Sequence, residues 1–146
     1  MRLQVTIPGV PVPQGSKMPW GGEANPHVRA WRETVARAAR ELMPDGPWPG
    51  PVSVKVTFVF PRPKAHFRSG KYAHEVKLTA PKWHTSTPDL DKLQRALGDA
   101  FKGVVLRDDS QVAVWEVQKL YGLQPCAQVE VTTLTEEEPD GYHDQG

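Results

Sequence analysis

The sequence of 146 residues has a mass of 16.3 kDa, which is close to the usual size of one domain. Hydrophobic residues make up 38% and charged residues 24%, so the chain holds enough apolar material for one core and is not wholly disordered. No apolar run approaches the roughly 18 residues of a membrane span, and the first residues lack the apolar stretch of a secretory signal. The single cysteine, Cys126, excludes an intramolecular disulfide and fits a reducing compartment. Together these features predict a soluble, cytoplasmic protein with no membrane partner.

The formal net charge of +1 hides an asymmetry along the chain. Residues 1–84 carry 13 Lys and Arg against 5 Asp and Glu, whereas residues 85–146 carry 5 against 12. Such a division favours a basic surface for a polyanion beside a concentrated acidic cluster. The alternative is that folding interleaves the two halves and cancels the field.

The first half of the chain predicts a strand, a helix and a second strand. Polar and apolar residues alternate over residues 2–7 and again over 52–60, which is the period-two pattern of half-buried strands. Residues 8–27 are rich in proline and glycine and predict an irregular loop. Apolar residues then recur at helical spacing from Val28 to Leu42, and Pro44 ends the predicted helix.

The second half predicts a long loop, a helix and two strands. Residues 61–88 show no periodicity and much proline, which indicates a loop. An apolar stripe predicts a helix from Leu90 to Phe101. Residues 111–120 and 127–134 predict strands, and the turn residues Gly122–Pro125 between them predict a hairpin.

These elements predict one α/β domain of the α+β type, with about four strands in a mixed or mainly antiparallel sheet and two main helices. We assign this domain to residues 1–134. Residues 135–146 hold several carboxylates and few apolar side chains, so we expect a flexible acidic tail there.

The densest chemical signal is a group of aspartates around the second helix. Asp89 and Asp91 stand where that helix begins, and Asp109 follows eighteen residues after Asp91. Residues two apart in mid-helix point about 200° away from each other, so the pair can share an ion only at the helix start. We therefore place Asp89 at or just before the N-cap and Asp91 in the first turn. Mg²⁺ prefers carboxylate oxygens, and a cation offsets the cost of gathering like charges.

Arg95 lies four residues after Asp91, on the same helix face, where it could contact a phosphate. Each of these pieces also has an ordinary structural explanation. Aspartate at a helix start is common capping chemistry that contributes about 0.5–2 kcal/mol. Asp91 and Arg95 could form a simple surface pair, and Asp108-Asp109-Ser110 is ordinary turn composition.

Taken together and in order, these residues resemble a known family. The stretch Thr87–Phe101, then Val104-Val105 and then Arg107–Val112, is similar to the RusA family of Holliday junction resolvases. The resemblance implies a Mg²⁺-dependent homodimeric endonuclease, with Mn²⁺ able to substitute, in a bacterial or phage-infected cell. Its substrate would be branched DNA, above all four-way junctions, which it would resolve by paired nicks.

The resemblance also implies roles for individual residues. The family's metal-binding aspartates fall on Asp89, Asp91 and Asp109, and Asp108 is a candidate neighbouring or alternative ligand. The family's essential basic residue, a lysine in the best-known member, falls on Arg95. Arginine keeps the charge and can clamp a phosphate with two hydrogen bonds, but it does not readily give up a proton. An electrostatic role therefore suits Arg95.

A basic segment, residues 61–84, comes directly before Asp89 and has Glu75 as its one carboxylate. Lysine and arginine contacts to phosphates dominate affinity for nucleic acids, and the interleaved aromatic residues could stack on bases. The alternative is a solvated loop with buried aromatic anchors. With the earlier loop, this segment supplies the predicted DNA-binding residues: Lys17, Arg62, Lys64, Arg68, Lys71 and Lys82.

Two other functions fit the same sequence. One is a non-catalytic protein that binds branched DNA or takes part in phage assembly, in which the aspartates only cap a helix and form a turn. The other keeps the metal site but acts as a less selective nuclease on branched DNA.

Overall fold

The fold follows from the apolar periodicity of six main elements. The computed structural model describes residues 1–15 and 26–135, so Lys17 and nearly all of the predicted acidic tail lie outside the described residues. The elements are β1 (Arg2–Pro8), α1 (His27–Arg40), β2 (Val52–Pro61), α2 (Leu90–Phe101), β3 (Val112–Gly122) and β4 (Cys126–Thr133). Each predicted helix and strand is present, with its ends within a few residues of the predicted ones.

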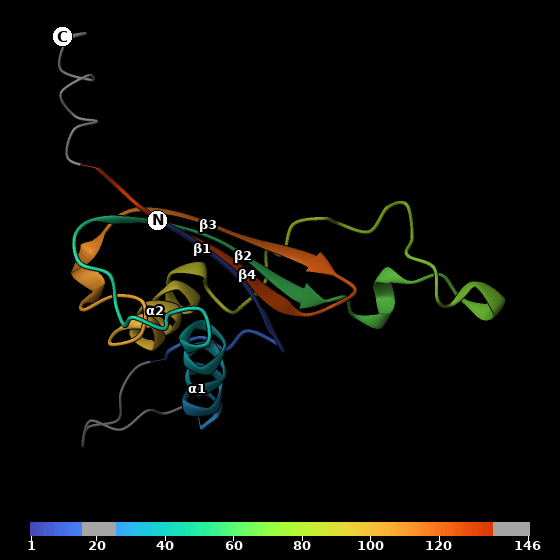
Figure 1. Cartoon of the computed structure of the whole chain (residues 1–146). Helices are drawn as coiled ribbons and strands as arrows, with labels where there is room; N and C mark the ends of the chain where they lie inside the picture. The colour runs from blue at the N-terminus through green and yellow to red at the C-terminus, as the bar shows by residue number, and fades with distance from the viewer. Residues whose placement is uncertain (16–25, 136–146) are drawn as a thin grey trace, which may run out of the picture.

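The four strands form one mixed sheet in the order β1-β4-β2-β3. Strand β4 pairs antiparallel with both β1 and β2, whereas β3 pairs with β2 in parallel. Both helices lie on one side of this sheet (Figure 1). The expected α+β domain with two helices and a mixed sheet is therefore confirmed.

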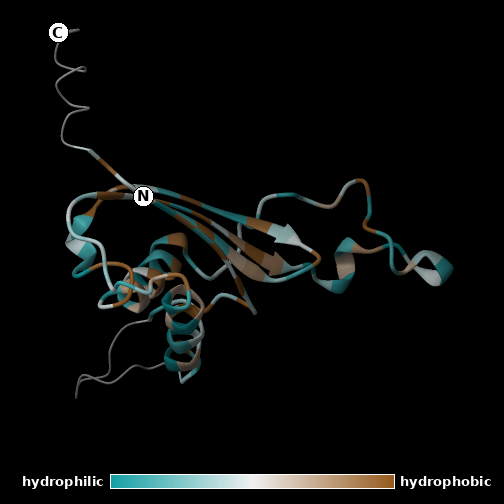
Figure 2. Cartoon of the chain, in the orientation of Figure 1, coloured by the Kyte–Doolittle hydropathy of each residue, from teal (hydrophilic) through white to brown (hydrophobic). Residues whose placement is uncertain are grey.

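The core lies between the sheet and the two helices. Apolar and polar colours alternate along the ribbons of strands and helices, as the two periodicities require (Figure 2). The apolar stripes of the two helices face this core. Their buried side chains are Val28, Trp31, Val35 and Ala39 from α1, and Leu93, Ala96, Leu97, Ala100 and Phe101 from α2. Within the described ranges, no helix is long and apolar enough to cross a membrane.

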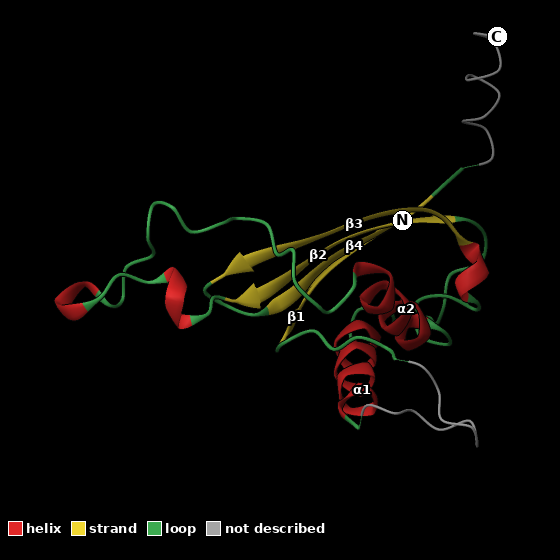
Figure 3. Cartoon of the chain, turned by 180° about the vertical axis from the view of Figure 1, so that it is seen from behind, coloured by secondary structure: helices red, strands yellow, loops and turns green. Residues whose placement is uncertain are grey.

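A loop of residues 62–84 links β2 to the segment before α2, and we call it the arm. It projects beyond the ends of β2 and β3 and contains only two short 3-10 helices, Lys64–His66 and Gly70–Tyr72 (Figure 3). The prediction of a long loop is therefore confirmed for this stretch.

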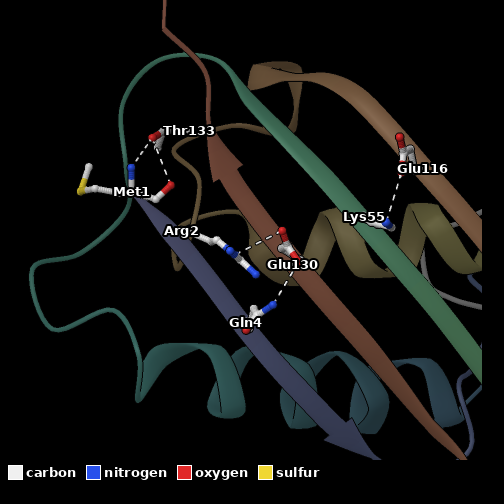
Figure 4. A network of polar contacts seen from close by, with 7 residues as sticks. All are labelled: Met1, Arg2, Gln4, Lys55, Glu116, Glu130 and Thr133. Carbon is white, nitrogen blue, oxygen red and sulfur yellow. Dashed lines mark hydrogen bonds and ion pairs between the residues drawn. The ribbon is translucent and has the colours of Figure 1, made fainter.

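The opposite face of the sheet is open and polar (Figure 4). The Glu130 carboxylate accepts a hydrogen bond from Gln4 Nε2 at 3.1 Å and lies 3.3 Å from Arg2 Nε. Lys55 Nζ lies 3.8 Å from the Glu116 carboxylate. Cations and carboxylates therefore alternate here, and this face presents no continuous basic surface to a polyanion.

The predicted hairpin between the last two strands is wrong. Strands β3 and β4 do not pair with each other, because β2 lies between them and pairs with both. The turn residues around Gln124 instead carry the chain across the end of β2. Phe58, Val59 and Phe60 of β2 are buried in succession, so both faces of the strand are covered here, which is typical of a strand inside a sheet and not at its edge.

Gly122 tests this topology, since it lies where the chain leaves β3 beside β2. A Cβ atom built there would stand 2.6 Å from Val59 Cγ1. We expect Gly122→Ala to lower the free energy of unfolding by about 1–3 kcal/mol through overpacking. Val59→Ala in the same chain should relieve the clash, so a double-mutant cycle in urea should show favourable coupling. Additive effects would contradict the observed contact.

Candidate functional site

The start of α2 places two of the predicted aspartates as expected. Asp89 is the N-cap, with extended dihedral angles, and Asp91 lies in the first turn. The Asp89 carbonyl oxygen accepts hydrogen bonds from the amides of Lys92 and Leu93, both at 3.2 Å. The Asp89 carboxylate makes no capping hydrogen bond and lies 4.0 Å from Lys92 Nζ, largely exposed. It therefore remains accessible to solvent and to a ligand.

A shallow hollow of about 300 Å³ runs between α2 and β3, and we call it the α2–β3 hollow. Its lining residues are Asp91, Gln94, Arg95, Gly98, Asp109 and Trp115. Three of the four predicted catalytic residues thus line one hollow, and Arg95 lies on α2 between Asp91 and the Gly98 position that Asp109 approaches. Asp89 is not among the lining residues. A larger hollow of about 370 Å³ lies on the open sheet face, but it gathers no such group of carboxylates.

Gln111 holds the turn that carries Asp109, and sequence analysis missed this role. Its Oε1 accepts hydrogen bonds from the amides of Arg107 and Asp108, at 2.7 and 3.0 Å. Its Nε2 donates to the carbonyl oxygens of Trp48 and Gly50, at 2.9 and 2.7 Å. One side chain therefore ties the Asp109 turn to the segment before β2. The spacing of Asp108 and Gln111 is that of a capping box, and this signal could have revealed the contact.

Asp108 has a local structural role. Its carboxylate accepts a hydrogen bond from the Ser110 amide at 3.0 Å and lies 3.8 Å from Lys102 Nζ. The hydrogen bonds from Ser110 and, more weakly, the nearby Lys102 charge lower the pKa of the Asp108 carboxyl group. Asp108 does not line the α2–β3 hollow. The structure thus favours capping over metal binding for this residue.

Gly98 marks the point where the Asp109 turn and Trp115 lie against α2. A Cβ atom at Gly98 would lie 3.8 Å from the Trp115 ring and 3.9 Å from Asp109 Cβ. Asp91 lies seven residues earlier, about 10 Å along the helix axis. The two aspartates therefore stand towards opposite ends of the hollow. Trp115, expected in the core, packs against the core but is only partly buried and also lines the hollow.

The carboxylate oxygens at this site are the type of ligand that a hard divalent cation prefers. Mg²⁺ is commonly held by one or two carboxylates together with waters and substrate phosphates, and Asp91 and Asp109 line one open hollow. Among residues 1–15 and 26–135, however, no three His, Cys, Asp or Glu side chains converge to hold a metal. The chain by itself thus offers a two-carboxylate hollow with Asp89 beside it, rather than a closed cage.

The arm has internal structure of its own. Arg68 Nη1 lies 2.6 Å from the Glu75 carboxylate, and its guanidinium stands 4.1 Å from the centre of the Tyr72 ring. The Arg68 amide also donates to the Glu75 carbonyl at 2.8 Å, next to a bridge between Phe67 and Val76. These contacts fold residues 66–77 back on themselves.

The predicted DNA-binding residues of the arm fall into two groups. Lys64, Lys71 and Lys82 are exposed and form no ion pair with a described residue. Arg62 donates to the Pro81 carbonyl at 2.7 Å, so it braces the base of the arm, as Arg68 braces its outer part. The three lysines therefore keep their charges available to a phosphate, whereas the two arginines also support the shape of the arm.

The arm returns to the body along the free edge of β3. The His84 amide donates to the Lys119 carbonyl at 3.2 Å, and the Tyr121 amide donates to the Lys82 carbonyl at 2.9 Å. The His84 ring is buried and stacks on Phe60, with ring centres 4.4 Å apart. Burial, and next the neighbouring Lys119 charge, lower the pKa of His84. A neutral imidazole therefore anchors the end of the arm at neutral pH.

Comparison with known proteins supports the resemblance seen in the sequence. The family described as Endodeoxyribonuclease RusA matches residues 8–132. The chain belongs to the RusA endodeoxyribonuclease family. The matched range includes the arm, α2 and the Asp109 turn, so RusA membership covers the α2–β3 hollow and its surroundings. Membership implies an endodeoxyribonuclease of the type that acts on Holliday junctions. RusA nucleases generally depend on a divalent metal.

A relative in Bacillus subtilis (strain 168) is similar over nearly its whole length. It is the uncharacterized protein YqaN, which is 30% identical over 143 residues. The similarity covers 91% of this chain and 97% of YqaN. This RusA-like chain and YqaN thus correspond along almost their full lengths.

Proposed function

We propose that this protein is a Mg²⁺-dependent endonuclease that resolves four-way DNA junctions by paired nicks, in recombination and repair. The observation that carries the proposal is the meeting of Asp91, Arg95 and Asp109 in one open hollow of a RusA-family chain. The Asp89 carboxylate makes no capping hydrogen bond, and capping does not explain why Asp109 and Arg95 line the same hollow as Asp91.

We assign metal binding to Asp89, Asp91 and Asp109. Two of them line the α2–β3 hollow, and the third stands exposed two residues before Asp91. When bound, the cation polarises the scissile phosphate and supplies an activated water. The positive end of the α2 dipole lies beside Asp89 and Asp91, and it stabilises the negative charge of these two carboxylates.

We assign transition-state stabilisation to Arg95. Its side chain is exposed in the hollow and forms no hydrogen bond or ion pair within the described ranges. Its guanidinium stays protonated and can form two hydrogen bonds to a phosphate. It therefore suits the negative charge that develops on the phosphate, and it needs no partner in the free protein.

We assign capture of the DNA arms of the junction to the basic arm and, from the earlier loop, to Lys17. The exposed Lys64, Lys71 and Lys82 support this, since their charges are not neutralised by the protein. A homodimer suits the substrate, because a two-fold protein places one active site at each of two opposed strands. We assign the nuclease domain to residues 1–134, acting in the cytoplasm of a bacterial or phage-infected cell.

The test is incubation of the purified protein with a labelled four-way junction and a matched linear duplex, with and without Mg²⁺. We expect paired nicks in the junction alone, and only with the cation. Binding without cleavage would favour the non-catalytic alternative. Equal cleavage of flaps and other branched DNA would favour the less selective nuclease.

Asp91→Asn should abolish cleavage but leave junction binding intact or tighter, because it removes a metal ligand and a charge that repels DNA. Cleavage rate and affinity are measured on the same junction. Glu116→Gln on the open sheet face is the matched control, since it removes a carboxylate remote from the hollow, and it should cleave normally. Wild-type cleavage that persists in excess chelator would exclude the metal role.

Arg95→Ala should lower single-turnover cleavage about 10²–10³-fold, the loss expected for one well-placed electrostatic contact. Thermal stability should change little, because the Arg95 side chain is exposed and unpaired in the described chain. Arg95→Lys should recover much of the rate, since it restores the charge. A near-normal rate for Arg95→Ala would remove Arg95 from the active site.

Lys64→Ala combined with Lys71→Ala should weaken junction affinity and flatten its salt dependence. Each lost phosphate contact should lower the slope of log affinity against log salt by about 0.9. Lys55→Ala is the matched control, because this exposed lysine lies on the open sheet face. The same slope in all three proteins would show that the arm lysines do not contact DNA.

A further inference from the structure

Lys119, near the end of β3, makes contacts that no assigned role explains. It lies on the same face of β3 as Trp115, four residues earlier, because alternate residues of a strand share a face. Its Nζ donates to the carbonyl oxygens of Ser86 and Pro88, at 2.7 Å each. Both carbonyls belong to the short segment that leads into Asp89.

These contacts are an unusual use of a lysine at the edge of a sheet. Within the described ranges, Lys119 forms no ion pair with a carboxylate. Two of its three ammonium donors go to backbone oxygens, and such charge-assisted hydrogen bonds are short and strong. The ammonium therefore orients the main chain just before α2 and does not serve as a surface charge.

The segment that Lys119 holds has little other support. Ser86 and Thr87 are exposed, and the apolar anchors of α2 begin only at Leu90 and Leu93. The preceding anchor is His84, whose amide donates to the Lys119 carbonyl. Residues 85–88 thus follow the His84 amide, which contacts the Lys119 carbonyl, and they include the two carbonyls that the Lys119 ammonium contacts. Among the described residues, Lys119 is the one whose side chain forms hydrogen bonds with this segment.

We propose that Lys119 is a positioning residue that holds residues 86–88 and thereby sets the position of Asp89 at the start of α2. The proposal rests on the proposed function, in which Asp89 and Asp91 bind the metal. On the same face of β3, Trp115 lies against Gly98 in the middle of α2, and Lys119 contacts the segment at the helix start. One strand therefore aligns both parts of the site.

The test compares Lys119→Met, which keeps the length of the aliphatic stem, with Lys119→Arg, which restores donors for both carbonyls. Lys55→Met, on the neighbouring strand β2, is the matched control. Amide hydrogen exchange is measured by mass spectrometry on the metal-free proteins. Single-turnover junction cleavage is measured across a Mg²⁺ titration, and junction affinity is measured in Ca²⁺.

We expect the amides of Lys92 and Leu93, which donate to the Asp89 carbonyl, to exchange about 10-fold faster or more in Lys119→Met, since the two hydrogen bonds that hold the preceding segment are lost. Cleavage should fall about 10-fold or more, with the Mg²⁺ midpoint moved to higher concentration, as for loss of a residue that orients metal ligands. Junction affinity should stay within about twofold of the wild-type value, because Lys119 is not one of the exposed arm lysines that we assign to DNA binding. Lys119→Arg should recover both exchange and cleavage, and Lys55→Met should match the wild type.

Wild-type exchange of the Lys92 and Leu93 amides in Lys119→Met, or wild-type cleavage by that variant, would overturn the proposal. Failure of Lys119→Arg to recover either property would overturn it too. A wild-type protein that cleaves no junction would overturn the proposed function instead. The exchange measurement would then still decide whether Lys119 holds the segment before Asp89.

Discussion

The parallel pairing of β2 with β3 is the constraint on which the candidate site depends. It places β3 at the edge of the sheet, next to α2, and in a register that pairs Val54 with Trp115 and Phe58 with Lys119. The start of β3 then brings Asp109 to the hollow, its middle packs Trp115 against Gly98, and its end holds the segment before Asp89. Pairing of β3 with β4 instead of β2 would change this register, and with it the positions of Trp115 and Lys119.

One side of α2 is buried in the core, and its other side is exposed at the α2–β3 hollow. Helix α2 has six buried residues that pack into the core, and its exposed side carries Asp91 and Arg95. The carboxylates remain exposed because gathering buried like charges is costly unless a cation or hydrogen bonds offset their repulsion. Gln111 and Lys119 hold the two ends of the acidic group through backbone oxygens and amides. The protein therefore determines where the chain runs and leaves the charged groups free for a ligand.

The fold separates the charges that the sequence holds in two halves. The arm carries its lysines away from the sheet, and its one carboxylate, Glu75, is paired with Arg68 (Figure 1). The open sheet face, by contrast, mixes cations with carboxylates (Figure 4). Folding thus does not cancel the basic charge of the arm, and the acidic group lies where the arm rejoins the body. This arrangement suits a polyanion that lies along the arm and reaches the hollow.

Local patterns in the amino-acid sequence specify the elements and the start of α2. Periodicity located all four strands and both helices, and the rule for residues two apart at a helix start placed Asp89 at or just before the N-cap and Asp91 in the first turn. The ordered motif from Thr87 to Val112 indicated the family. These features are local, so the spacing of neighbouring residues specifies them.

The packing of the whole sheet sets which strands are neighbours and what holds the site together. The turn around Gln124 is compatible with a hairpin or with a crossover, and in the packed sheet β2 lies between β3 and β4. The contacts of Gln111 with Gly50 and of Lys119 with Pro88 join residues 61 and 31 positions apart. No local pattern encodes such pairs, because their partners are backbone oxygens, which every residue carries, and only the packed sheet brings them within reach.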